Sequence, residues 1–299
     1  MSILKDNING GTEALSKLMK RKYFIAPGVF DGISAILAEK AGFSALYLSG
    51  SGVAGRSGLP DLSLTTLSEV ADEAQRVVAV TKLPLIVDAD TGFGEAINVV
   101  RCVKSLESAG AAAIHIEDQE APKRCGQLDG KRLISEKDME RKIRAAVATR
   151  KNRKFMIIAR TDARAVEGFE GAVRRANLYL EAGADVIFPE ALESQEEFKR
   201  YAKEVKVPLI ANMTEFGKSP LIEADVLGDM GYKIVLFPLT GFRAALLSME
   251  NAYSALKSDL TQKGFIDKLM TRKRFYEIID YYGYQAEDDL FYSGKNKKK

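Results

Sequence analysis

Residues 84–118 read PLIVDADTGFGEAINVVRCVKSLESAGAAAIHIED, and this stretch decides the fold. Apolar runs at Pro84–Asp90 and Ala112–Asp118 have the composition of buried strands. Between them, Glu95–Ser108 has helical spacing of its apolar residues, and Gly110 follows where a glycine readily adopts the left-handed conformation that ends a helix. A strand, a helix and a second strand in this order predict a parallel pair of strands covered by a helix.

The same unit recurs along the chain. The other strand-like runs lie at Phe24–Pro27, Ala45–Ser49, Phe155–Asp162, Asp185–Glu190, Pro208–Thr214 and Lys233–Pro238. The other helical segments include Leu64–Val80, Glu136–Thr149, Phe169–Glu181 and Gln195–Val205. Eight such units with short links predict an α/β fold, a (β/α)8 barrel. An open doubly wound sheet is disfavoured, because no glycine-rich dinucleotide fingerprint follows the first strand at Pro27–Asp31.

The predicted domain organisation is a single barrel domain over residues 1–299, with an N-terminal helix and a C-terminal helical extension from about residue 242. The chain after Phe242 exceeds what a barrel requires. We expect one or two long helices there, ending near Tyr282 and packing on a neighbouring element or subunit.

Composition excludes several classes of protein. A chain of 299 residues that is 46% apolar can bury a full-sized core, so neither a disordered protein nor a small disulfide scaffold is expected. The 44 basic and 41 acidic residues nearly balance, and terminal lysines account for the surplus, so no nucleic-acid partner is expected. No apolar run reaches the roughly 18–20 residues of a membrane span, and no signal peptide is recognisable. Two cysteines suit a reducing compartment, so we expect a cytoplasmic protein without a membrane partner.

Polar residues stand at the carboxyl ends of the predicted strands. These ends contain Asp88 and Asp90, His115 and Glu117, Arg160 and Asp162, Glu190, and Asn212 with Thr214. The carboxyl ends of barrel strands face the active site of such folds. Because strand side chains alternate, two residues separated by one position share a face. We therefore expect these side chains to form one site.

Asp88, Asp90 and Glu117 form a cluster of carboxylates without cysteine or several histidines. Hard oxygen ligands of this kind suit Mg²⁺, with Mn²⁺ as the alternative, rather than Zn²⁺. The competing interpretation is that these acids cap the following helices or pair with Arg160. Within the whole set of strand ends, the sequence predicts a metal site.

Cys125 lies in a long polar loop, residues 119–131, after the fourth strand. The neighbouring Lys123 and Arg124 could lower the pKa of its thiol, which would suit proton transfer. For an isolated cysteine, an inert loop thiol is the more common case. His115, the single histidine, fits a hydrogen bond within the site or an ordinary core position. Candidate clamps for a substrate carboxylate are Arg160, Arg243 and Arg272. No strand end carries a pocket-facing lysine, which disfavours Schiff-base chemistry.

At these residues the chain resembles the isocitrate lyase/phosphoenolpyruvate mutase superfamily and, within it, the methylisocitrate lyases. The segments that carry the resemblance are Tyr47-Leu48-Ser49-Gly50, Gly58-Leu59-Pro60-Asp61, residues 87–94, residues 115–119, Lys123-Arg124-Cys125-Gly126, residues 159–163, residues 188–191, residues 211–217, Phe242-Arg243-Ala244 and Thr271-Arg272. Together they extend from about Phe24 to Tyr282. The combination is specific, whereas each segment alone is not.

The resemblance implies a Mg²⁺-dependent cytoplasmic lyase that cleaves a small tricarboxylate, 2-methylisocitrate, to pyruvate and succinate in propionate catabolism. It also implies a homotetramer that exchanges a C-terminal helix between subunits. The implied metal ligands are Asp88 and Asp90, and the implied proton donor to the succinate carbon is Cys125. Tyr47 and Glu190 are both candidates for the base. The implied substrate contacts are Ser49, Gly50, Ser51, Cys125, Gly126, Arg160, Glu190, Asn212, Met213, Thr214, Arg243 and Arg272.

One residue departs from the pattern, because Gln127 stands where the lyases usually have histidine after Cys-Gly. Glutamine can hold a carboxylate but carries neither a proton nor a positive charge, so we predict a less acidic Cys125 thiol than histidine would give. Alternative substrates are isocitrate, 2,3-dimethylmalate and oxaloacetate. A phosphonate mutase is disfavoured by Cys125, which that branch lacks. A noncatalytic barrel that binds a dicarboxylate is the alternative from a different class.

Overall fold

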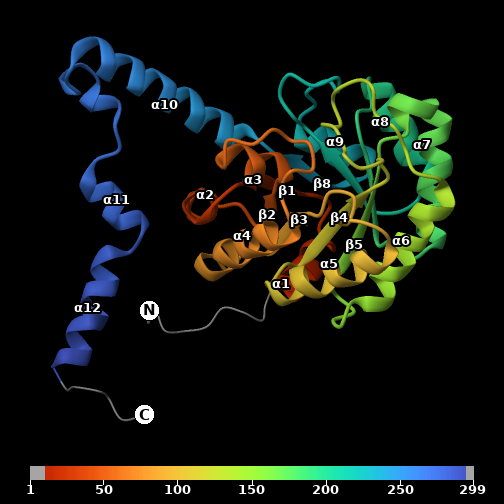
Figure 1. Ribbon diagram of the computed structural model, residues 1–299, viewed down its shortest axis with the longest axis horizontal. Coiled ribbons are helices and arrows are strands. Elements are labelled where there is room, and N and C mark those ends of the chain that lie inside the picture. The colour runs from red at the N-terminus through yellow and green to blue at the C-terminus, as the bar shows by residue number, and fades with distance from the viewer. Residues whose placement is uncertain (1–10, 294–299) are drawn as a thin grey trace. The chain divides into compact units, whose positions relative to one another are not determined.

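The computed structural model describes residues 11–293, and its central feature is a closed barrel of parallel strands (Figure 1). The strands are β1 (Phe24–Val29), β2 (Leu46–Leu48), β3 (Leu85–Asp88), β4 (Ala113–Glu117), β5 (Met156–Thr161), β6 (Val186–Pro189), β7 (Leu209–Asn212) and β8 (Tyr232–Phe237). Each strand pairs with the next, and β8 pairs with β1, with Phe24 opposite Ile234. The predicted (β/α)8 barrel is confirmed.

Helices alternate with the strands. They are α1 (Gly11–Leu18), α2 (Gly32–Lys40), α3 (Gly50–Arg56), α4 (Leu67–Val80), α5 (Ala96–Ser108), α6 (Glu136–Thr149), α7 (Arg164–Glu181), α8 (Gln195–Glu204) and α9 (Ala224–Met230). The predicted bounds of α6 are confirmed. Helix α7 begins five residues before the predicted start at Phe169. Its first turn is separated from the rest of the helix by a kink at Gly168, where φ is +77°. The predicted segment is the part after this kink.

Strand side chains alternate between two apolar clusters. The inner cluster fills the barrel and includes Ile86, Ile158 and Ile210, one from each of three strands. The outer cluster, which includes Val87, packs the other face of the strands against the helices. Helix α1 adds Leu15 to the inner cluster and so covers the end of the barrel where the strands begin. The opposite end, where the strands finish, is left to polar side chains.

The chain divides after Phe242 into the barrel unit and a C-terminal unit. Helix α10 (Thr240–Asp259) leads into the C-terminal unit, which continues with a 3₁₀ helix (Lys263–Lys268), α11 (Arg272–Ile278) and α12 (Tyr281–Tyr292). A long helix in this region is confirmed by α10, whereas the predicted end near Tyr282 is wrong. Asp280 takes a left-handed conformation, with φ of +54°, and separates α11 from α12, which extends the helical region to Tyr292.

Apolar side chains are exposed along this C-terminal unit. They include Leu246, Leu247, Met249, Tyr253, Leu256, Leu260, Ile266, Phe275, Leu290 and Phe291. Neither α10 nor α12 contains a buried residue. Across residues 11–293, no helix has both the length and the apolar character needed to cross a bilayer.

Candidate active site

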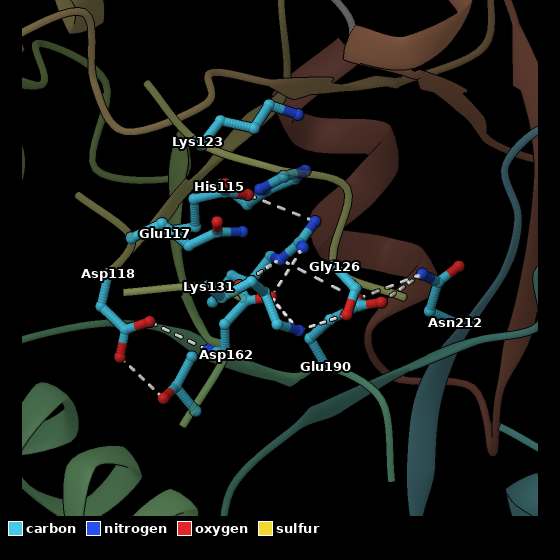
Figure 2. A network of polar contacts seen from close by, with 12 residues as sticks. His115, Glu117, Asp118, Lys123, Gly126, Lys131, Asp162, Glu190 and Asn212 are labelled. Carbon is cyan, nitrogen blue, oxygen red and sulfur yellow. Dashed lines mark hydrogen bonds and ion pairs between the residues drawn. The ribbon is translucent and has the colours of Figure 1, made fainter. Parts of the chain in front are cut away.

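Five strands deliver polar side chains to the carboxyl end of the barrel. They are Asp88 of β3, His115 and Glu117 of β4, Arg160 of β5, Glu190 directly after β6, and Asn212 of β7. Figure 2 shows His115, Glu117, Glu190 and Asn212 around one network of polar contacts. The structure thus brings together the residues that the sequence places at strand ends.

Three of these side chains form a group with the spacing of metal ligands. Asp88, His115 and Glu117 are buried and present ligand atoms that lie within 4.8 Å of one another. In the described part of the chain, neither carboxylate oxygen of Glu117 has a hydrogen-bond partner, although Oε2 forms an ion pair with Arg160. A buried carboxylate without hydrogen bonds is costly, so the group fits a hard divalent cation, whose preferred ligands are oxygens.

The environment of this group shifts its protonation equilibria. Burial raises the pKa of Glu117 well above its ordinary value. Burial also lowers the pKa of His115 to about 4, so its imidazole is neutral at pH 7. His115 Nε2 lies 2.8 Å from the Tyr47 hydroxyl and 3.4 Å from Asp88 Oδ1. His115 therefore lies in the site and contacts a candidate metal ligand. This agrees with the prediction of a hydrogen bond within the site and not with an ordinary core position.

Asp90 has a different environment from Asp88. Strand β3 ends at Asp88, and Asp90 takes a left-handed conformation with φ of +47°, so the expected shared strand face is wrong for this pair. The Asp90 backbone N–H donates to Asp88 Oδ1 over 3.0 Å, and Asp90 Oδ1 lies 3.1 Å from Lys123 Nζ. Burial raises the pKa of Asp90 to about 6. The metal-ligand role of Asp90 stays a prediction.

Arg160 is a buried cation enclosed by acids. Its Nε and Nη2 donate to the two carboxylate oxygens of Asp162 over 2.9 and 3.1 Å, and its Nη1 lies 3.3 Å from Glu117 Oε2. Although burial lowers the pKa of Arg160, Asp162 and Glu117 raise it well above the ordinary value. A permanently charged guanidinium fixed in this way can bind a carboxylate of a substrate.

The loop with Cys125 packs directly on this cation. A Cβ atom placed on Gly126 would lie 2.2 Å from Arg160 Nη2 and 2.5 Å from Glu190 Cγ, so only glycine fits. Burial raises the pKa of the half-buried Cys125 thiol. The expectation that Lys123 and Arg124 lower this pKa is therefore wrong. A thiol that keeps its proton at neutral pH suits a proton donor.

Amide groups surround Glu190. The side chain of Asn212 donates to Glu190 Oε2 over 3.1 Å, and the amide of Gln127 donates to Glu190 Oε1. The amide oxygen of Gln127 accepts from the backbone N–H of Lys218 over 2.8 Å. Gln127 thus links Glu190 to the loop after β7, a contact that sequence alone did not predict.

The remaining predicted site residues of the barrel differ in the groups that they place near the site. The Gly50 backbone N–H donates to Asp88 Oδ2 over 3.0 Å, and Ser49 is buried beside it at the start of α3, where Ser51 follows. Burial raises the pKa of Tyr47 well above its ordinary value. Met213 lies in the core, where its sulfur accepts from the Ile222 backbone N–H, whereas the neighbouring Thr214 is a buried polar residue.

Two predicted residues belong to the C-terminal unit, since Arg243 lies in α10 and Arg272 is the first residue of α11. Two lysines of the Cys125 loop, Lys123 and Lys131, are buried, which was not predicted from the sequence. Lys123 forms ion pairs with Asp61 and Asp90. A lysine in a polar loop is usually solvent-exposed, so the composition of the loop does not indicate that either lysine is buried.

Comparison with known proteins relates the whole barrel to one family. The profile of the phosphoenolpyruvate phosphomutase family matches residues 15–257. The chain is 56% identical over 269 residues to 2-methylisocitrate lyase of Aeropyrum pernix, which covers 90% of this chain and 87% of that protein. It is 47% identical over 273 residues to 2-methylisocitrate lyase of Salmonella typhimurium, which covers 91% of this chain and 92% of that protein.

Solved structures of similar proteins have the same fold. A crystal structure of 2,3-dimethylmalate lyase superposes with a TM-score of 0.88 at 36% identity, over 94% of this chain and 95% of that one. The phosphoenolpyruvate phosphomutase of Streptomyces platensis superposes with a TM-score of 0.90 at 27% identity, over 94% of this chain and 99% of that one.

Proposed function

The chain belongs to the phosphoenolpyruvate phosphomutase family, and from that premise we propose that it is a carbon–carbon lyase that cleaves 2-methylisocitrate to pyruvate and succinate. The observation that carries this proposal is the 56% identity, over nine-tenths of the chain, to a protein named for that activity. The arrangement of acids, arginine and thiol at the strand ends supports it.

The cleavage needs three things of the protein. A base removes the proton of the substrate hydroxyl, the carbon–carbon bond breaks as the pyruvate carbonyl forms, and the electron pair left on the succinate carbon takes up a proton. We assign the last proton to the Cys125 thiol, whose raised pKa keeps it protonated. Arg160 would hold a substrate carboxylate and stabilise the charge that spreads onto it.

The sequence offers two candidates for the base, Tyr47 and Glu190. The Tyr47 hydroxyl is already engaged with His115 Nε2 and Asp88 Oδ2, at 2.8 and 3.3 Å. The Glu190 carboxylate accepts hydrogen bonds from the Asn212 and Gln127 amides, which orient it, and its Oε2 lies 3.8 Å from Arg160 Nε. We assign the base to Glu190 and a positioning role to Tyr47.

Mg²⁺ is the proposed cofactor, with Mn²⁺ as the alternative. Asp88 and Glu117 would hold it, with Asp90 close by, because their ligand oxygens lie together and the buried Glu117 carboxylate has no hydrogen bond, which fits a hard cation. When bound, such an ion supplies Lewis-acid stabilisation of the negative charge that develops on the substrate oxygens. We infer that propionate catabolism in the cytoplasm is the setting.

We further propose that the protein is a homotetramer that exchanges C-terminal helices between subunits. The apolar side chains exposed along α10–α12, Leu246, Leu247 and Tyr253 among them, support this, because large exposed apolar surfaces mark interaction sites. Light scattering on the purified chain tests it. A monomer at micromolar concentration contradicts the assembly but leaves the lyase proposal intact.

The activity test measures pyruvate release from 2-methylisocitrate beside glyoxylate release from isocitrate, each with Mg²⁺ and with EDTA. We expect pyruvate only with metal, and much faster than glyoxylate. Loss of activity in the Cys125→Ser variant, with an unchanged melting temperature, would assign the thiol. Inactivity on both substrates in a folded sample with Mg²⁺ would refute the proposal, and 2,3-dimethylmalate and oxaloacetate would then be assayed.

A further inference from the structure

Lys131 is a buried lysine that the proposed chemistry does not use. Its side chain is 1% exposed, although it lies in the loop between β4 and α6. Its Nζ donates to the backbone carbonyl of Gly126 and to Asp162 Oδ1, the latter over 3.0 Å. Figure 2 shows Lys131 together with Gly126 and Asp162. An ammonium group is costly to bury, and these two acceptors are what compensate it.

The two acceptors belong to different parts of the site. Gly126 directly follows Cys125, so a hydrogen bond to the Gly126 carbonyl restrains the position of the Cys125 thiol. Asp162 follows β5 and receives both hydrogen bonds of the Arg160 fork, at 2.9 and 3.1 Å. Its backbone N–H donates to Asp118 Oδ1 over 2.9 Å, which fixes it to the end of β4. Asp162 is therefore held firmly in place, and the ion pair with Lys131 attaches the loop to it.

We propose that Lys131 is a positioning residue that fastens the Cys125–Gly126 segment to the Arg160 carboxylate clamp through Asp162. It would hold the thiol at a fixed distance from the carboxylate that Arg160 binds. The inference rests on the proposed lyase function for its catalytic consequence, but not for the loop contact itself. Lys131→Met removes the ammonium group at similar length, and Lys131→Arg keeps a donor with positive charge.

Thiol labelling tests the contact without any substrate. The two cysteines are alkylated with iodoacetamide and their rates read separately by peptide mass spectrometry. Cys125 reports the loop, and Cys102, which is fully buried in α5, reports opening of the whole barrel. Because a hydrogen bond from a charged donor is lost, we expect Lys131→Met to label Cys125 at least about tenfold faster with Cys102 unchanged. Lys131→Arg should restore most of the protection.

Lys218→Met is the matched control. Lys218 forms an ion pair with Asp129 of the same loop, but Asp129 is exposed, so labelling of Cys125 should change less than about twofold. Unchanged labelling in Lys131→Met would overturn the proposal. A parallel rise at Cys102 would overturn it too, since Lys131 would then serve only general stability.

Kinetics test the catalytic consequence. We expect Lys131→Met to lower kcat/KM for 2-methylisocitrate by about 10- to 100-fold and Lys131→Arg to recover most of it, because misplaced groups lose much of their effect. Faster labelling with an unchanged kcat/KM would overturn the link to Arg160. If the wild-type protein does not cleave the substrate, the lyase proposal fails, whereas the labelling result still decides whether Lys131 fastens the loop.

Discussion

The sharpest prediction concerns Gly126→Ala, which adds one methyl group where the Cys125 loop meets the floor of the site. The backbone of Gly126 needs no left-handed conformation, so alanine is compatible with its local geometry. Its methyl carbon, however, would lie 2.2 Å from Arg160 Nη2 and 2.5 Å from Glu190 Cγ. Ordinary contacts of this kind begin at 3.4 Å, so the loop or its neighbours must move by more than 1 Å.

The neighbours have little freedom to move. Arg160 is held by both oxygens of Asp162, and Glu190 by the Asn212 and Gln127 amides. The loop must therefore take up the shift and carry Cys125 with it. A displacement of about 1 Å in a reacting group costs on the order of 100-fold in rate, so we expect kcat/KM to fall by about that factor.

Pyruvate release at saturating Mg²⁺ measures this effect, with the melting temperature as a check on folding. The control is Gly11→Ala, at a helical glycine where the nearest atom to a new methyl carbon lies 3.6 Å away. That variant should keep wild-type activity. If Gly126→Ala stays within about threefold of wild type, the loop does not depend on this contact, and the assignment of Cys125 to proton transfer loses its geometric basis.

Three further outcomes follow from the site. Gln127→His should lower the pKa of the Cys125 thiol and move the alkaline limb of the pH–rate profile to lower pH; an unchanged profile contradicts this. Asp88→Asn should lower activity at least about 100-fold and make it insensitive to EDTA, as measured by pyruvate release. Because burial lowers the pKa of His115 from 6.5 to about 4, the unfolded chain binds a proton that the folded chain does not between these pH values. The contribution of His115 to the free energy of unfolding should therefore fall by up to about 3 kcal/mol from pH 6.5 to 4, and urea titrations of the wild type and His115→Gln should differ by that amount in this pH range.

The barrel and the strand-end side chains were predictable because both depend on short-range patterns. The alternation within β4 and β5 is enough to place Glu117, Arg160 and their neighbours on the same end of the barrel. The acidity of Cys125 was not predictable in this way. Lys123, two residues away in sequence, directs its ammonium group to Asp61 and Asp90, and burial then decides the pKa of the thiol.

Contacts between this loop and distant segments of the chain could not be predicted from the sequence for the same reason. Lys131 and Asp162 are 31 residues apart, and nothing in the loop distinguishes a buried lysine from a solvated one. The C-terminal helices were also misjudged, because Asp280 adopts a left-handed conformation that a non-glycine residue rarely takes. In both cases tertiary structure overrides the local pattern.

The anchoring of the Cys125 loop has a consequence for divergence within the family. Lys131 attaches the loop to Asp162 and holds the carbonyl of Gly126, and between these two points Leu128 and Asp129 are exposed, whereas Gln127 is half-buried. Mutations accumulate with little penalty at exposed positions away from such anchors. Evolutionary drift should thus concentrate in this short arc, while inherited changes of substrate preference arise at Gln127, whose amide reaches Glu190. A library randomised at Leu128 and Asp129 should therefore retain far more active clones than one randomised at Gln127.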